Sequence, residues 1–264
     1  MMLRLGLSTC YFKEKTLDEW KSVKEAGIED IEISMNCQLE EYLEKGDPLA
    51  ADLKEAGLNI WSIHIPFGRP FDLTDPDPDH FADIEYRYKT LIDAGARWGA
   101  KVITTHASTE PFPQDQREAR MARGKYLYKM LGDYAAERGM KITVEVLPRT
   151  CMGNCSQECM DFTDGEVSFI NFDVNHLLKE SHADFIHNAG SRIITTHLSD
   201  YDFIDERHWI PGDGKIDWKE FYTLMEDAGY EGPYLFELGE SISGRKVTPA
   251  ELVARFKDVI GYEA

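Results

Sequence analysis

Short apolar segments rich in β-branched residues alternate along this chain with longer segments whose apolar residues recur at helical spacing. The short segments predict eight strands, near residues 3–9, 30–35, 59–67, 101–108, 141–148, 168–175, 193–200 and 233–239. The longer segments predict helices, among them 17–26, 79–98, 114–138, 217–229 and 248–261. The pattern therefore indicates eight repeats of a strand followed by a helix.

Glycines punctuate the predicted helix ends. They are Gly27, Gly57, Gly99, Gly139, Gly190 and Gly229. A glycine just past the last turn is typical of a left-handed helix cap, and we expect that conformation at all six positions.

Strands that alternate with helices predict a parallel sheet, and eight similar repeats favour its closure into a (β/α)8 TIM barrel. The length of 264 residues suits that fold, which typically takes about 250. No change of composition suggests a second domain, so residues 1–264 are expected to form one. The segment 201–216 is long, polar and rich in Gly and Pro, which is typical of a functional loop.

The charge balance narrows the possible partners. The chain carries 48 acidic against 29 basic residues, a net charge of −19, and no basic run. Nucleic-acid binding draws on Lys and Arg to neutralise phosphates, so we expect no nucleic-acid partner. No apolar run reaches the roughly 18 residues of a membrane helix, and the N-terminus lacks a signal-peptide pattern. We therefore expect a soluble, cytoplasmic protein without a membrane partner.

Ionisable residues stand at the ends of six successive predicted strands. They are His64, His106, Glu145, Asp173, His197 and Glu237. Strands of a parallel sheet are covered on both faces, and a charged group there is costly unless it is paired or binds metal. In a barrel these ends converge on the C-terminal mouth, where active sites of this fold lie.

Four of these residues come from consecutive strands and predict a metal site: Glu145, Asp173, His197 and Glu237. Three clustered carboxylates would repel one another without a cation. Three oxygen ligands and one imidazole suit Mn²⁺, Mg²⁺, Co²⁺ or Zn²⁺, and the oxygen-rich set favours an octahedral ion with open positions. Phe67 and Trp209 are candidates for an apolar wall against the substrate.

Several motifs resemble the sugar phosphate isomerase/epimerase family of the xylose isomerase-like barrels, and the resemblance covers nearly the whole chain. They are the segments beginning His64-Ile65-Pro66, Val144-Glu145-Val146, Phe172-Asp173-Val174, Thr196-His197-Leu198, Pro211-Gly212-Asp213 and Phe236-Glu237. The resemblance implies that the four predicted ligands hold Mn²⁺ or a similar ion. It implies a ketose-type substrate, with Glu145 and Glu237 as acid and base around an enediolate intermediate. It also implies substrate contacts from His176, Arg207 and His208, and the remaining histidines, His64 and His106, suit hydrogen bonds to sugar hydroxyls.

Other functions within this superfamily stay open. An inosose dehydratase or inosose isomerase would use a similar metal site. Metal-dependent apurinic endonucleases use more histidines, but the net charge argues against them, and Glu206 stands where that family carries Asp. A non-catalytic sugar-binding protein is a further alternative. The motif after Glu145 reads Val-Leu-Pro-Arg instead of the epimerase pattern Pro-Leu-Asn-Arg, which leaves the substrate open. The sequence also leaves open substrate phosphorylation, the native metal and assembly as a homo-oligomer.

Overall fold

All eight predicted strands are present, in a computed structural model that describes residues 3–239, 241–242 and 245–263. The strands are β1 (Leu5–Ser8), β2 (Asp30–Ser34), β3 (Asn59–His64), β4 (Val102–Thr105), β5 (Lys141–Glu145), β6 (Ser168–Asp173), β7 (Ile193–His197) and β8 (Tyr234–Phe236). A small antiparallel pair, β9 (Ser241–Ile242) and β10 (Arg245–Lys246), follows them.

The eight strands are parallel neighbours in chain order, and β1 pairs with both β2 and β8. The ring closes between β7 and β8 through Leu198. Its N–H donates to the Leu235 carbonyl (2.8 Å), and its carbonyl accepts from Glu237 N–H (3.1 Å). The fold is therefore a (β/α)8 TIM barrel, as the alternating pattern predicted.

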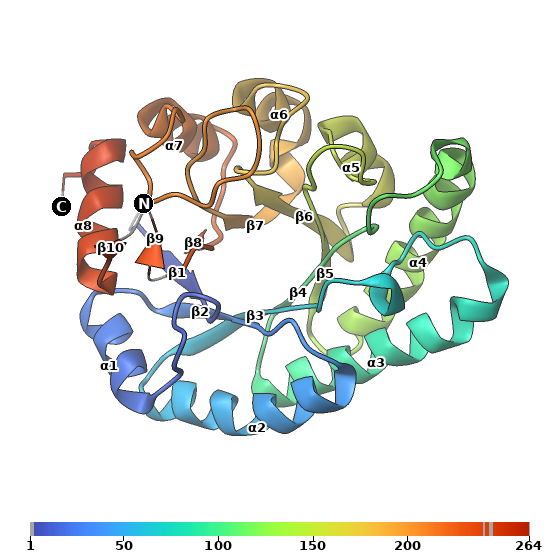
Figure 1. Ribbon diagram of the computed structural model, residues 1–264, viewed down its shortest axis with the longest axis horizontal. Coiled ribbons are helices and arrows are strands. Elements are labelled where there is room, and N and C mark those ends of the chain that lie inside the picture. The colour runs from blue at the N-terminus through green and yellow to red at the C-terminus, as the bar shows by residue number, and fades with distance from the viewer. Residues whose placement is uncertain (1–2, 240, 243–244, 264) are drawn as a thin grey trace.

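Eight α-helices of the described part of the chain surround the strands (Figure 1). They are α1 (Leu17–Glu25), α2 (Leu39–Glu55), α3 (Phe81–Trp98), α4 (Arg117–Ala136), α5 (Ser156–Phe162), α6 (His182–Ala189), α7 (Trp218–Asp227) and α8 (Pro249–Ile260). The last helix lies beside the first, so the helical ring closes along with the sheet. No helix among the described residues is long and apolar enough to cross a membrane.

Five of the six helix-ending glycines have the expected positive φ, from +72° at Gly139 to +95° at Gly99. The expectation for Gly190 is wrong, because its φ is −52°. Helix α6 does not stop there in a left-handed turn. It continues into a 3₁₀ turn over Gly190–Arg192, which leads directly into β7, so the backbone stays right-handed.

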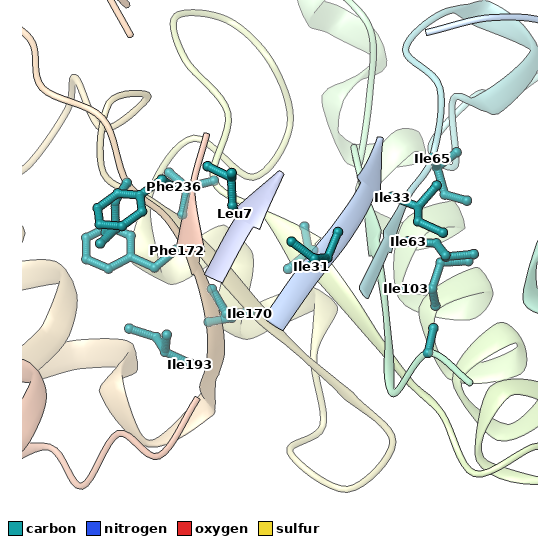
Figure 2. Packing of buried hydrophobic residues seen from close by; sticks show 14 of the residues in the cluster. Leu7, Ile31, Ile33, Ile63, Ile65, Ile103, Ile170, Phe172, Ile193 and Phe236 are labelled. Atoms are coloured by element: carbon teal, nitrogen blue, oxygen red, sulfur yellow. The ribbon is translucent and has the colours of Figure 1, made fainter. Parts of the chain in front are cut away.

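Alternate residues of each strand face the surrounding helices and form the main core. Figure 2 shows part of this packing, with Ile33 of β2 near Ile63 of β3 and Ile103 of β4. The other positions point into the barrel, where the middle is polar rather than filled with large apolar side chains. Fully buried there are Glu32, Ser62, Thr104, Thr143, Asn171 and Thr195.

Candidate metal centre and its cavity

The four predicted metal ligands lie together at the C-terminal mouth of the barrel. Glu145, Asp173 and His197 are the last residues of β5, β6 and β7, and Glu237 directly follows β8. Each offers a ligand atom within 4.8 Å of the ligand atoms of the other three. Because parallel strands of a barrel end at one mouth, the strand ends themselves bring this four-residue cluster together.

Burial and charge make the cluster suitable for a cation. Asp173 is fully buried, and its Oδ2 accepts no hydrogen bond from the described residues. Burial raises the pKa of Asp173 to about 6, the imidazolium of His176 opposes that rise, and the charges of Glu145 and Glu237 add to it. Oδ2 of Asp173 thus accepts no hydrogen bond within the described part of the chain, although Nδ1 of His176 lies 3.2 Å away, and a buried oxygen of this kind beside two further carboxylates fits a divalent ion.

His197 faces the carboxylates through one ring nitrogen. Its Nδ1 lies 3.1 Å from Glu237 and 3.3 Å from Glu145. Burial lowers the pKa of His197, but the neighbouring carboxylates, Glu237 first, outweigh burial and hold it well above its usual value. Burial raises the pKa of Glu237, but the charge of His197 and its hydrogen bond, with the charge of His64, together outweigh burial and bring this pKa to about 2. Nδ1 therefore lies where a metal would take the place of a proton.

Two further predicted residues support Glu145. Nε2 of His64 lies 2.9 Å from Glu145 Oε2, and Nε2 of His106 lies 3.2 Å from the same oxygen. Burial raises the pKa of Glu145, but the charges of His197, His106 and His64 together bring it well below its usual value. These contacts leave Glu145 Oε1 to face His197 and the rest of the cluster.

Two further groups of side chains could also hold an ion, and only the first of them shares residues with the four-residue cluster. One is His64, Glu145 and His197, and the other is His176, Glu206 and His208. In the second group, Nε2 of His176 contacts Glu206 at 3.1 Å, and its Nδ1 lies 3.1 Å from the Val146 carbonyl. The mouth of the barrel therefore offers more than one arrangement of metal-ligating groups.

A cavity of about 500 Å³ opens above Glu145 and Glu237, a volume within the range of small-molecule sites. Its lining includes the predicted residues His64, His106, His176, His208 and Phe67. Phe67 is 47% exposed and meets the His106 ring edge to face at 5.3 Å, as an apolar wall would. Arg207 and Trp209 are not among the described residues that line it. Arg207 instead donates to Asp202 (3.0 Å) and lies near the Trp209 ring.

The β7–α7 loop, residues 198–217, forms one wall of the cavity and is folded around Asp200. This buried carboxylate accepts four hydrogen bonds: its Oδ1 from the N–H groups of Tyr201 and Ile216, and its Oδ2 from Gly212 N–H and the Trp218 indole. A Cβ added at Gly214 would lie 2.2 Å from Asp200 Oδ1. The motifs around Asp200 and Pro211 to Trp218 are therefore two halves of one structural unit.

Arg149 joins three loops at the rim of the cavity. Its guanidinium contacts Glu110 after β4 (2.6 Å), and Asp205 (2.7 Å) and Glu206 (3.1 Å) in the β7–α7 loop. It is the only Lys or Arg among the described residues of the cavity lining, and three carboxylates already surround it.

Sequence reasoning missed Glu32 and Asn175 as contributors to the site. The carboxylate of Glu32 lies 2.9 Å from Nε2 of His197, beneath the cluster. Asn175 accepts hydrogen bonds from the N–H groups of Arg207 and His208, which holds His208 at the cavity. An acidic residue in the middle of the 30–35 segment was a usable signal for Glu32. Asn175 carried none, because its partners come from a distant loop.

A family model and several curated proteins are similar to this chain. A family model described as a xylose isomerase-like TIM barrel matches residues 20–256. An L-ribulose 3-epimerase of Methylomonas sp. (strain DH-1) is 26% identical over 188 residues, which cover 67% of this chain and 63% of the relative. An inosose dehydratase of Clostridium perfringens is 26% identical over 172 residues, covering 53% of this chain and 58% of the relative. The chain thus spans about six-tenths of the length of the curated relatives it matches.

Among solved structures, a D-psicose 3-epimerase determined in the presence of D-fructose superposes with a TM-score of 0.78. The superposition covers 98% of each chain at 19% sequence identity. At that identity the similarity shows the fold alone.

Proposed function

Because the chain belongs to the xylose isomerase-like TIM barrel family, we propose that it is a divalent-metal-dependent isomerase or epimerase of a small sugar or polyol. The reaction moves a proton on the carbon beside a carbonyl, through an enediolate. The single observation that carries the proposal is the four-residue cluster of three carboxylates and one imidazole at the base of a substrate-sized cavity.

Glu145, Asp173, His197 and Glu237 would hold the ion, and Mn²⁺ is the proposed one because the set is rich in oxygen. When bound, such an ion polarises a carbonyl and stabilises negative charge on its oxygen. The same four residues would then serve both binding and chemistry, which explains why three carboxylates are tolerated so close together.

Glu237 and Glu145 are the proposed proton-transfer groups. Both border the cavity, and they come from β8 and β5, so they reach a substrate from different strands. One removes the proton and the other returns one on the opposite face. His64 and His106 hold Glu145 Oε2, which keeps that carboxylate from turning away from the substrate.

The cavity suits an uncharged, unphosphorylated substrate. His176, His208 and Phe67 would contact its hydroxyls and ring. Arg207 and Trp209 would reach the substrate only if the β7–α7 loop rearranged around it, because neither lines the cavity. A phosphate group would need a cation with free donors, and Arg149 already meets three carboxylates. The expected partner is therefore a free sugar or polyol.

The second candidate is an inosose dehydratase, a lyase that acts on a cyclic polyol. The similarity to the relative from Clostridium perfringens favours it, and the same cluster would serve. Both candidates begin by removing a proton beside a carbonyl, so they differ in whether water leaves afterwards.

A panel of ketoses and inososes in D₂O with added Mn²⁺ tests the proposal. The expected result is that deuterium from solvent enters the carbon beside the carbonyl of one substrate, as NMR would detect. A new epimer identifies the first candidate, and a dehydrated product identifies the second. If no member of the panel exchanges a proton and no divalent ion binds, the proposal is wrong.

Metal stoichiometry separates this proposal from the apurinic endonuclease alternative. We expect one divalent ion per chain by elemental analysis, and no cleavage of abasic-site duplex DNA. Three ions per chain with cleavage of such DNA would reverse the ranking, because His176, Glu206 and His208 would then form part of a larger metal centre.

A further inference from the structure

Glu32 is a buried carboxylate inside the barrel, and it has no role in the proposed chemistry. In β2, Ile31 and Ile33 belong to the apolar core, so Glu32 between them points into the barrel. Its side chain is fully buried. A carboxylate in such a place is costly unless its partners compensate, so those partners reveal its role.

The two oxygens of Glu32 have different partners. Oε2 accepts a hydrogen bond from the hydroxyl of Ser62 (2.8 Å), its register neighbour on β3. Oε1 lies 2.9 Å from Nε2 of His197, an ion-pair distance, and accepts no hydrogen bond from the described residues. One oxygen is therefore anchored to the barrel wall, and the other is presented to the histidine of the metal cluster.

The ring of His197 is thus approached from two sides. Its Nδ1 faces the carboxylates of Glu237 and Glu145, whereas its Nε2 faces only Glu32 among the described carboxylates. Asn171 also touches the ring, but its Nδ2 lies 3.1 Å from Nδ1 and 3.2 Å from Nε2. Because those distances are nearly equal, Asn171 does not distinguish the two nitrogens, and Glu32 does.

We propose that Glu32 is a positioning residue that accepts the Nε2 proton of His197 and so keeps Nδ1 free to bind the metal. An imidazole binds a metal only through an unprotonated nitrogen. A carboxylate on the other nitrogen fixes the tautomer and the ring orientation, and increases the basicity of the ligand. This inference rests on the proposed function, because it requires the cluster to bind a divalent ion.

The inference is tested by the metal affinity of the 264-residue chain, measured by titration calorimetry with Zn²⁺ and with Mn²⁺. Glu32→Leu removes the acceptor, and we expect the affinity to fall about 10–100-fold. Glu32→Gln keeps an acceptor without the charge, so a smaller loss is expected. Asp30→Asn is the matched control: Asp30 is 1% exposed on the same strand and binds Arg4, away from the cluster. Its variant should bind metal as the wild type does.

A second readout reports the tautomer directly and would not move if Glu32 served only the packing. In Zn²⁺-loaded chain with ¹⁵N-labelled histidine, we expect the His197 ring to be protonated at Nε2 alone. The Glu32 variants should weaken or lose that signal, and Asp30→Asn should keep it. If Glu32→Leu does not fold, Glu32→Gln decides by the same two measurements.

The outcomes separate this inference from the proposed function. If the wild type binds metal and the folded Glu32 variants match it in affinity and tautomer, Glu32 has no positioning role, and the proposed function stands. If the wild type binds no divalent ion at all, the proposed function fails, and the inference fails with it.

Discussion

The floor of the cavity carries its charged groups on the ends of strands, whereas the β7–α7 loop keeps its shape through side chains that bind backbone N–H groups. Glu145, Asp173 and His197 are each the last residue of a strand, and the barrel places them. The loop depends instead on Asp200 and Asn175, whose hydrogen bonds span many residues of sequence. Changes in the floor should therefore affect chemistry, and changes in the loop should affect stability and substrate binding.

The largest expected effect is on turnover when a floor carboxylate loses its charge. Glu237→Gln keeps the shape of the side chain and one ligating oxygen but loses the base. We expect proton transfer to fall roughly 10²–10⁴-fold while metal binding is retained, and the same for Glu145→Gln. Solvent deuterium exchange into the substrate is the measurement.

Glu226→Gln is the control for these variants, because Glu226 lies on α7 and contacts Tyr234 outside the cavity. It should exchange deuterium at the wild-type rate. Exchange at that rate in both floor variants would show that the two carboxylates are not the acid and base.

The floor could be predicted from sequence because two regularities fix it. Strand residues alternate between two faces, and parallel strands of a barrel end at one mouth, so charged residues at strand ends must converge. Glu32 escaped this reasoning because it lies in the middle of β2. Its partner His197 is adjacent only once the barrel brings β2 and β7 to face each other across its interior.

The loop could not be predicted in the same way. Its length and polarity indicated a functional segment, but the direction of each side chain depends on distant anchors. Arg207 and His208 are neighbours in sequence, yet only His208 lines the cavity, because Asn175 and Asp202 orient this part of the loop. The left-handed cap expected at Gly190 failed for a similar reason, since α6 continues into a turn that β7 requires.

The second prediction concerns the β7–α7 loop and its effect on the stability of the protein. Asp200→Asn replaces one acceptor oxygen with an N–H₂ group that faces two donors. We expect the free energy of unfolding to fall by about 2–4 kcal/mol, because buried donors lose their partner. Chemical denaturation followed by fluorescence measures it, and metal affinity of the folded fraction should stay near the wild-type value.

Asp213→Asn is the matched control in the same loop. Asp213 accepts from Arg255 at a partly exposed site, so its loss should cost less than about 1 kcal/mol. Equal losses for the two variants would contradict the anchoring role of Asp200.

The third prediction concerns pH and the contact between α6 and the loop. Nε2 of His182 donates to the Val174 carbonyl (2.9 Å), and the ring packs near Tyr201. Burial lowers the pKa of His182 from 6.5 to about 4. Between these two values the unfolded state binds more protons than the folded state does. The contribution of His182 to the free energy of unfolding is therefore present above pH 6.5 and is lost as pH falls from about 6.5 to about 4.

We expect that loss of unfolding free energy to be about 1–2 kcal/mol, since His182 is only partly buried. Unfolding free energies of the wild type and His182→Gln, measured from pH 7 to pH 4, isolate it from the titration of carboxylates. The wild type should lose more stability than the variant in this window, and parallel curves would show that His182 is not responsible.

The smallest expected effects distinguish two neighbours in the loop. His208 lines the cavity, so His208→Ala should raise KM about 3–10-fold, the cost of one lost hydrogen bond to a substrate hydroxyl. Arg207 is turned to Asp202, so Arg207→Ala should change KM by less than about 2-fold. Steady-state kinetics on the substrate found by the deuterium panel would measure both. If Arg207→Ala raises KM as much as His208→Ala does, the loop must rearrange around substrate and bring Arg207 into the cavity. In that case the floor residues would keep their positions when substrate binds, whereas the β7–α7 loop would not.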